Sequence, residues 1–254
     1  MPDRRRPDEK KRDLTEKRRD IIEYLMNTYR AVEAVKEGVR GFFAKRQILM
    51  IRYTGADRGA VLKRVSQLKA ERKSLLSHGD ICQIISAVQA TRRIPGDLVE
   101  FGVAYGASAR IIAEYGAENG GGRTLHLFDT FEGLPEPGPN DSARFCKGSY
   151  GCSLESVQQY LSGLPVAYHK GFFPHTADGL RDAVFSFVHL DVDLYESTLE
   201  GLKFFYPRMS RGGIILSHDY RSSTGVDKAF EEFFADKPEP VVGLSGYQCL
   251  VVKL

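Results

Sequence analysis

Apolar residues recur at steps of three and four positions through the first third of the chain, a spacing typical of amphipathic helices. Three helices are predicted, with apolar positions at Ile21, Ile22, Leu25, Tyr29, Val32 and Val35, then at Val61, Val65, Leu68, Leu75 and Leu76, then at Ile81, Ile84, Ile85 and Val88. Ser77 and Asp80 have the spacing of a helix N-terminal cap, and the third helix should stop before Pro95. Residues 21–94 are therefore expected to form a helical extension or lid, and the charged residues 1–20 an arm that is disordered or a solvated helix start.

From residue 97 onward the pattern changes to short apolar runs that alternate with helical stretches. The runs, predicted to be strands, cover residues 98–103, 124–128, 166–169, 184–190, 213–216, 241–244 and 248–252. The helical stretches cover residues 107–118, 153–162, 194–209 and 225–236. Alternation at this spacing is typical of βαβ units in a mostly parallel sheet that is covered on both faces.

The last two runs are separated by only Ser245, Gly246 and Tyr247, so they should form an antiparallel hairpin at the edge of the sheet. The expected fold class is α/β, a Rossmann-like seven-stranded sheet with a C-terminal antiparallel hairpin and a helical N-terminal extension. This arrangement matches the sheet of class I methyltransferases better than that of a dinucleotide dehydrogenase, and residues 95–254 should form that domain.

The composition is that of a globular protein, with 42% hydrophobic and 27% charged residues among 254. No apolar stretch is long enough for a transmembrane helix, and the charged N-terminus is unlike a secretory signal. The four cysteines are scattered and none pair at CxxC spacing, which argues against a disulfide framework and a zinc ribbon. We expect a cytoplasmic protein with reduced thiols and no membrane partner.

The net charge of +3 conceals an asymmetry along the chain. Residues 1–73 carry 21 basic and 11 acidic side chains, a net of +10, which leaves 15 basic and 22 acidic side chains, a net of −7, for the rest. The basic segment 45–73 is predicted to be a lid or subunit contact that faces the acceptor substrate. The alternative is a solvated helix face that packs on the acidic part of the chain.

In a doubly wound sheet, ligands bind at the carboxyl ends of the strands, so candidate chemistry is sought there. The first strand ends in an acid and two glycines, Glu100, Gly102 and Gly106, before a helix begins. Ala104 and Ala107 break the dinucleotide fingerprint G-x-G-x-x-G, but glycines still let a backbone pass close to a ligand. The alternative is an ordinary tight turn between a strand and a helix.

Acidic residues also end the second and fourth strands. Asp129 follows the glycine turn at the distance at which a carboxylate accepts hydrogen bonds from ribose hydroxyls, although it could also be a solvated strand end. Asp191 and Asp193 lie two positions apart, where they could hold a hard cation and a base side by side. Alternatively, Asp193 caps the next helix, with Glu196 completing a capping box, and Asp191 is a loop acid.

The fifth strand ends in His218 and Asp219. Because the fourth and fifth strands should be neighbours, Asp191, His218 and Asp219 are expected to converge as a candidate metal site. His218 could instead be a structural histidine that bonds to the backbone.

Together these strand ends resemble the macrocin O-methyltransferase family (the TylF/MycF type), class I enzymes that use S-adenosylmethionine to methylate sugar hydroxyls in natural-product biosynthesis. The resemblance covers about residues 80–254. The matching segments are 97–108 (DLVEFGVAYGAS), 127–135 (LFDTFEGLP), 189–198 (HLDVDLYEST), 212–220 (GGIILSHDY) and 225–230 (GVDKAF).

The resemblance implies roles for most of these residues. S-adenosylmethionine would be bound by Glu100, Gly102, Val103, Ala104, Tyr105, Gly106, Asp129 and Thr130. Asp191 would be a Mg²⁺ ligand, with His218 and Asp219 completing the site, and Asp193 would be the general base, with His218 as a second catalytic candidate. Many members of the family carry two aspartates where this chain has His218 and Asp219, so the identity of the metal is open.

The predicted function is S-adenosylmethionine-dependent O-methylation of a sugar, either nucleotide-linked or part of a glycosylated natural product, with help from a divalent metal. The expected partners are this small-molecule acceptor and further copies of the chain, and no nucleic acid. The alternative is an RNA methyltransferase that uses the basic N-terminal segment, but that segment lacks interleaved aromatic residues. A nicotinamide oxidoreductase is disfavoured because the glycine fingerprint is broken. An interaction protein with a degenerate site is disfavoured because the chain carries acids at the strand ends, namely Asp129, Asp191, Asp193 and Asp219.

Overall fold

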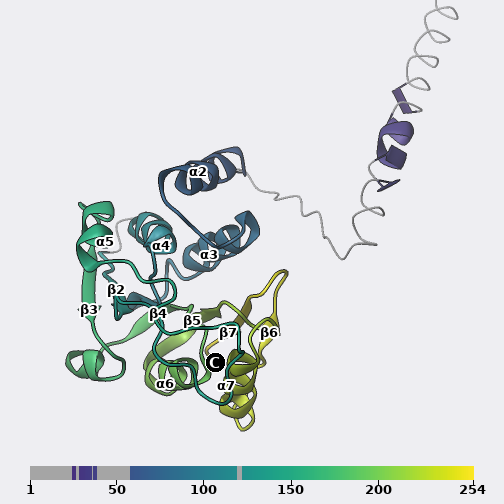
Figure 1. Ribbon diagram of the computed structural model, residues 1–254. Coiled ribbons are helices and arrows are strands. Elements are labelled where there is room, and N and C mark those ends of the chain that lie inside the picture. The colour runs from purple at the N-terminus through teal and green to yellow at the C-terminus, as the bar shows by residue number, and fades with distance from the viewer. Residues whose placement is uncertain (1–24, 27–28, 36, 39–57, 119–121) are drawn as a thin grey trace, which may run out of the picture. The chain divides into compact units, whose positions relative to one another are not determined.

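The computed structural model describes residues 25–26, 29–35, 37–38, 58–118 and 122–254, and the chain divides into two units, Met1–Gly55 and Ala56–Leu254. In the first unit the described residues are helical (Figure 1), as their periodicity predicts. The large apolar side chains among them are exposed. The predicted arm, residues 1–20, lies outside the described residues, as do residues 45–57 of the basic segment.

The second unit begins with two helices, α2 (Arg58–Glu71) and α3 (His78–Ala90). The predicted cap is confirmed: the Ser77 hydroxyl accepts from the backbone N–H of Asp80, and the Asp80 carboxylate accepts from the N–H of Ser77. These two hydrogen bonds satisfy donors that a helix start otherwise leaves free. The apolar stripe of α3 is fully buried, so the helix is part of the core.

The described residues form one seven-stranded sheet, as the pattern predicts, and its strand order is β3-β2-β1-β4-β5-β7-β6. The strands are β1 (Asp97–Phe101), β2 (Leu125–Asp129), β3 (Val166–Lys170), β4 (Phe185–Leu190), β5 (Met209–Ser217), β6 (Val242–Gly243) and β7 (Cys249–Val252). The first five pair in parallel, while β7 pairs antiparallel with both β5 and β6. Every residue of β4 is buried, as expected for a central strand covered on both faces.

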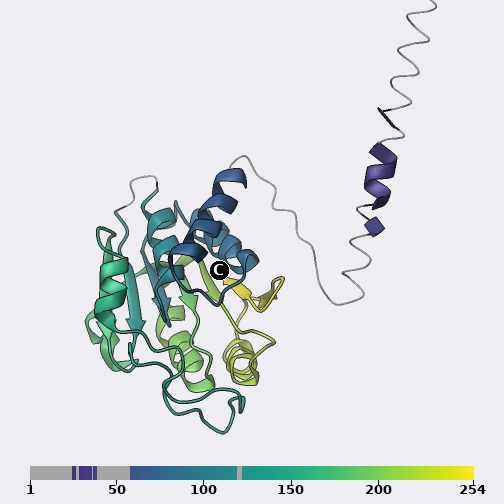
Figure 2. The same cartoon turned by 45° about the horizontal axis from the view of Figure 1, so that its top comes forward.

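Helices cover both faces of this sheet (Figures 1 and 2), with α2, α3 and α4 (Ala107–Ala117) on one side and α6 (Tyr195–Phe205) and α7 (Thr224–Phe234) on the other. The short α5 (Leu154–Tyr160) follows a long loop after β2, and the 3-10 helix η1 (His175–Leu180) follows β3. Aromatic rings fill the core beneath α6, where Phe128 packs edge-on against Phe205.

Several element boundaries differ from those predicted; the strand expected over residues 213–216, for example, begins at Met209. The helix expected over residues 194–209 ends at Phe205 and continues as the 3-10 helix η2 (Tyr206–Arg208), which contains Pro207. Proline lacks a backbone N–H and cannot continue an α-helical ladder. The strand expected over residues 241–244 is reduced to Val242–Gly243, an exposed edge that pairs on one side only.

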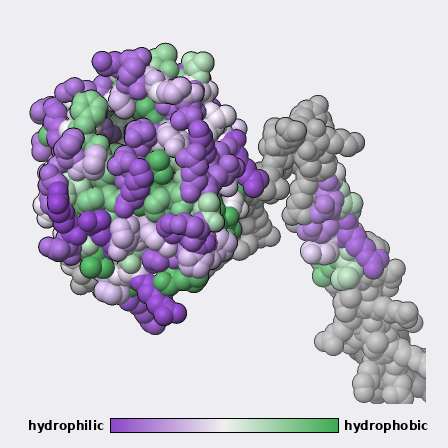
Figure 3. All heavy atoms as spheres, turned by 90° about the horizontal axis from the view of Figure 1, so that it is seen from below, coloured by the Kyte–Doolittle hydropathy of each residue, from purple (hydrophilic) through white to green (hydrophobic). Residues whose placement is uncertain are grey.

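In the view from below (Figure 3), hydrophobic residues gather near the middle of the face and hydrophilic residues surround them. Among the described residues, no helix combines the length and the hydrophobicity needed to cross a bilayer.

Candidate active site

A pocket of about 340 Å³ opens at the carboxyl ends of the parallel strands. Its walls come from the segments that follow β1, β2, β4 and β5, from residues 73–76 between α2 and α3, and from the loop 133–150. Of the predicted site residues, the pocket is lined by Gly102, Val103, Ala104, Tyr105, Asp129, Thr130, Asp191, Asp193, His218 and Asp219. The volume is in the range of small-molecule sites.

The glycine turn after β1 is held by a close approach between two chain segments. A side chain on Gly102 would overlap the backbone carbonyl of Asp191, so only glycine fits there. Gly106 has a φ of +80° at the N-terminus of α4, a left-handed conformation that favours glycine, but it does not line the pocket. Gly102 therefore sets the distance between the turn and the segment carrying Asp191.

Asp129 closes the turn with its carboxylate. Oδ2 accepts hydrogen bonds from the backbone N–H groups of Val103 (2.7 Å) and Ala104 (3.2 Å), and Oδ1 accepts from the N–H of Phe131 (2.7 Å). The carboxylate is thus bonded to the protein and not a simply solvated strand end, yet it still lines the pocket. A carboxylate has about four acceptor positions, so capacity remains for a ligand hydroxyl.

Glu100 is placed differently from the other predicted cofactor residues. Its side chain is fully buried behind the pocket wall, and Oε1 lies 2.9 Å from Nδ1 of His189, so the structure brings it to a histidine and not to the pocket. Burial raises the pKa of the Glu100 carboxyl, and His189 opposes that effect.

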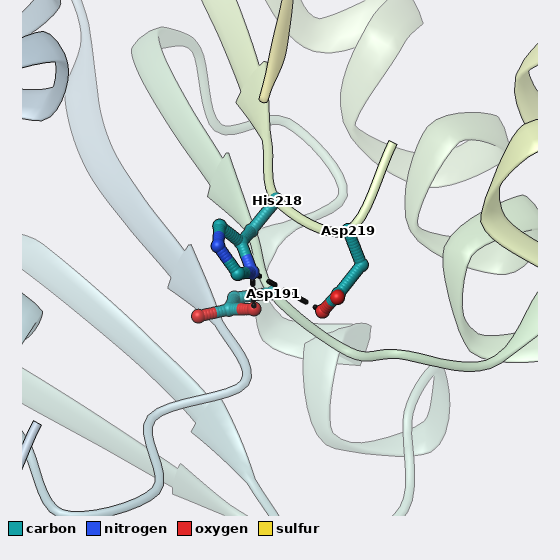
Figure 4. Close-up of side chains that lie close together, drawn as sticks. All are labelled: Asp191, His218 and Asp219. Carbon is teal, nitrogen blue, oxygen red and sulfur yellow. Dashed lines mark hydrogen bonds and ion pairs between the residues drawn. The ribbon is translucent and has the colours of Figure 1, made fainter. Parts of the chain in front are cut away.

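Asp191, His218 and Asp219 converge as the strand order predicts (Figure 4). Nδ1 of His218 lies 3.2 Å from Oδ1 of Asp191 and 3.1 Å from Oδ2 of Asp219. One potential ligand atom from each residue lies within 4.8 Å of the others. The imidazole ring thus bonds to carboxylates, and the alternative of a histidine that bonds to the backbone does not hold for its side chain.

The charges of this cluster shift its pKa values strongly. Burial alone would lower the pKa of His218, but Asp191 and Asp219 outweigh it and raise that pKa to about 11. Burial, with Asp191 and Asp219 nearby, raises the pKa of Asp193 to about 9. The negative charges of Asp191 and Asp219 therefore favour a proton on both His218 and Asp193.

Asp193 lines the pocket but does not cap α6, so the predicted capping alternative is wrong. Leu194 occupies the cap position, and Asp193 has a φ of +61°, a left-handed conformation that is strained for a residue with a side chain. The N–H of Tyr195 is instead bonded by Oδ1 of Asp141 (2.7 Å), from the loop 133–150. A distant aspartate thus caps the helix that follows Asp193.

The same loop brings a cation to the cluster. Arg144 lines the pocket, and its guanidinium lies 3.3 Å from Oδ1 of Asp219 and 3.4 Å from Oγ of Ser222. Neither Asp141 nor Arg144 was predicted from the sequence, because the loop has no periodicity and its position depends on contacts with α6 and α7.

Arg72 was also missed, and it links the end of α2 to the glycine turn. It donates to the carbonyl of Tyr105 (2.7 Å) and to Oγ of Ser156 (2.8 Å). Further back on α2, Arg64 pairs with Glu114 of α4 (2.9 Å). The described part of the basic segment thus packs on acidic and backbone groups of the domain, which is the alternative to a lid that faces the substrate. Lys73, at the end of this segment, lines the pocket.

Comparison with known proteins places this site in a family. The family model of macrocin-O-methyltransferase (TylF) matches residues 77–241, which include both the glycine turn and the cluster. The chain belongs to the macrocin-O-methyltransferase family. The predicted resemblance is thereby confirmed.

Relatives of this macrocin-O-methyltransferase family member act in antibiotic pathways. A tetracenomycin rhamnosyl 4'-O-methyltransferase of Streptomyces olivaceus is 34% identical over 50% of this chain and 54% of its own length. Demethyldecarbamoylnovobiocin O-methyltransferase of Streptomyces niveus is 28% identical over 56% and 59%. The chain thus spans little more than half the length of these curated relatives.

Among solved structures, the O-methyltransferase NovP matches with a TM-score of 0.60 and 25% identity, over 71% of this chain and 81% of its own. The family member described here therefore has the fold of a class I O-methyltransferase, which confirms the predicted fold class.

Proposed function

We propose that the protein transfers a methyl group from S-adenosylmethionine to a hydroxyl of a sugar, either within a glycosylated natural product or in a nucleotide-linked sugar. One observation carries the proposal: a single pocket joins a glycine turn closed by Asp129 to a cluster of carboxylates and an imidazole. The first half suits a nucleoside cofactor and the second suits the activation of a hydroxyl. The relatives named above, which are O-methyltransferases of antibiotic pathways, support the same class of acceptor.

A divalent cation fits the donor set of the cluster. Asp191 and Asp219 offer oxygen atoms, and His218 offers Nδ1, all within 4.8 Å of one another. Burial, and then the negative charges of Asp191 and Asp219, raise the pKa of Asp193, and a cation would relieve the repulsion between these carboxylates. Mg²⁺ prefers oxygen ligands, whereas an imidazole ligand also suits Mn²⁺ or Co²⁺. When bound, such a cation would lower the pKa of a sugar hydroxyl near it.

The remaining roles belong to the chain's own residues. Asp129 and the turn at Val103 and Ala104 hold the cofactor, whose sulfonium carries an activated methyl group. Asp193 lies beside the cluster and would accept the proton of the sugar hydroxyl in its ionised form, which the positive charge of a cation held by Asp191, His218 and Asp219 would favour. His218 is the second candidate for that role. A new bond forms between the sugar oxygen and the methyl carbon, the bond from that carbon to sulfur breaks, and its electrons stay on the sulfur. Holding the three atoms in line supplies much of the acceleration.

The domain organisation that we propose assigns methyl transfer to residues 95–254 and a covering role to the helices before them. Residues 73–76, which connect α2 to α3, line the pocket and support this division.

The test is a methyl-transfer assay against a panel of nucleotide deoxysugars and glycosylated natural products, with and without excess chelator. We expect transfer to a sugar hydroxyl, loss of activity in chelator, and restoration by Mg²⁺, Mn²⁺ or Co²⁺. Full activity in chelator would discard the metal and leave Asp193 or His218 as a metal-free base. Absence of transfer to every sugar would contradict the proposed acceptor class.

A further inference from the structure

Asp80 is a buried carboxylate of the N-terminal helices that reaches the cluster. It lies in the first turn of α3 and is only 6% exposed. Its Oδ2 atom accepts a hydrogen bond from the N–H of Ser77 (2.8 Å) and lies 3.9 Å from Nε2 of His218. The capping box therefore aims a negative charge at the imidazole.

The two nitrogens of His218 face different surroundings. Nδ1 faces the two carboxylates of the cluster, at 3.2 Å from Asp191 and 3.1 Å from Asp219, whereas Nε2 faces Asp80 (Figure 4 draws the first two). An imidazole that binds a cation must be neutral at the binding nitrogen, and its proton then sits on the other nitrogen. A carboxylate beside that proton fixes both the tautomer and the direction of the ring.

Asp80 is itself held in place from two sides. The capping box fixes it to Ser77, and Gly246 of the β6–β7 turn packs so closely on Oδ1 that a Cβ there would lie 2.9 Å away. Gln83 of the same helix donates to the carbonyl of Ser245 in this turn (3.0 Å). The carboxylate therefore has little freedom to turn away from His218.

We propose that Asp80 is a positioning residue for His218: it keeps the proton on Nε2 and leaves Nδ1 directed at the cation. The inference rests on the proposed function, in which Asp191, His218 and Asp219 hold that cation. It makes α3 a functional part of the site, although this helix lies before the strands that carry the cluster.

The test measures the binding of Mn²⁺ to the full chain by electron paramagnetic resonance, without S-adenosylmethionine or acceptor. Asp80→Asn keeps an oxygen that can accept from Ser77 but removes the charge, and it should weaken Mn²⁺ binding on the order of tenfold. Ser77→Ala is the matched control: it removes the hydroxyl half of the capping box but keeps the charge of Asp80 and the backbone N–H that holds it, so it should lower stability while leaving Mn²⁺ affinity unchanged.

Repeating the Asp80→Asn measurement in the His218→Asp variant separates positioning of the ring from simple attraction between Asp80 and the cation. In His218→Asp there is no ring to orient, so Asp80→Asn should cost less than about threefold in affinity. Equal losses of Mn²⁺ affinity with and without His218 would mean that Asp80 acts through its charge alone. An unchanged Mn²⁺ affinity in Asp80→Asn would mean that Asp80 plays no part in the site. Either result overturns the inference.

If the wild type fails to bind Mn²⁺, both the cation site and the inference are wrong, and methyl transfer in chelator then tells whether the proposed reaction survives. If the wild type binds Mn²⁺ and only the Asp80 variants behave otherwise than expected, the proposed function stands without this inference.

Discussion

Asp129 closes the glycine turn, and we propose that the same side chain also binds the ribose of the cofactor. The sequence predicts its place, because an acid at the end of the second strand of such a sheet must lie beside the glycine turn. It does not predict that the carboxylate accepts hydrogen bonds from three backbone N–H groups, because those bonds depend on the path of the turn in space. If Asp129 also binds the ribose, as we propose, the order of the turn and the affinity for the cofactor depend on the same side chain.

Replacing Asp129 by alanine should weaken S-adenosylmethionine binding by about 1.5–3 kcal/mol or more, the range for hydrogen bonds to a charged group. The stability of the protein should fall as well, because the N–H groups of Val103 and Ala104 lose their acceptor. Calorimetric titration of the cofactor measures the first effect and chemical denaturation the second. Asp178→Ala, at an exposed ion pair with Arg181, is the control. An unchanged affinity in Asp129→Ala would remove this residue from the cofactor site.

A second residue-scale prediction concerns His169, which stacks on Phe128 and lies 3.0 Å from Nδ1 of His126. Burial, and then the neighbouring His126, lower the pKa of His169 to about 4. An unfolded histidine titrates near 6.5, so between pH 6.5 and 4 the unfolded chain binds more protons than the folded one. The contribution of His169 to stability is thus full above pH 6.5 and is lost as the pH falls towards 4.

Urea denaturation at several pH values from 7.5 to 4.5 measures this loss. We expect the stability of His169→Gln to fall less steeply with acidification than that of the wild type. Equal slopes for the two proteins would show that His169 is not the group responsible.

At the scale of elements, the strands and the terminal hairpin follow from the alternation of short apolar runs and helical stretches. The loop 133–150 does not, because it lacks periodicity and gains its place through contacts with α6 and α7. Asp141 from this loop bonds the N–H of Tyr195, and Lys228 of α7 donates to Asn140 (2.8 Å). The loop thereby carries Arg144 and Tyr150 to the pocket.

Asp141→Ala should lower the free energy of unfolding by about 1 kcal/mol, as for the loss of other helix caps. Because the loop is then less fixed, KM for the sugar acceptor should rise while the affinity for S-adenosylmethionine stays constant. Asp141→Asn retains an oxygen acceptor and should behave much like the wild type. A change in cofactor affinity without a change in acceptor KM would contradict this role of the loop.

At the scale of the whole molecule, the convergence of Asp191, His218 and Asp219 could be predicted because neighbouring parallel strands end at one edge. The positions of Arg72 and Asp80 could not, since α2, which Arg72 directly follows, and α3, which carries Asp80, have no short sequence signal for their placement on the sheet. The basic helix face was assigned to the acceptor, yet Arg64 is paired with Glu114. A homo-oligomeric state and a cytoplasmic location stay predictions.

The central claim is that this pocket methylates a sugar hydroxyl with Asp193 as the proton acceptor. The most direct measurement follows transfer of a labelled methyl group from S-adenosylmethionine to the best acceptor of the panel, by the wild type and by Asp193→Asn. Proton transfer by a positioned side chain contributes about 10²–10⁴-fold, so kcat should fall by that factor while the affinity for S-adenosylmethionine is unchanged. Full activity of Asp193→Asn would contradict the claim.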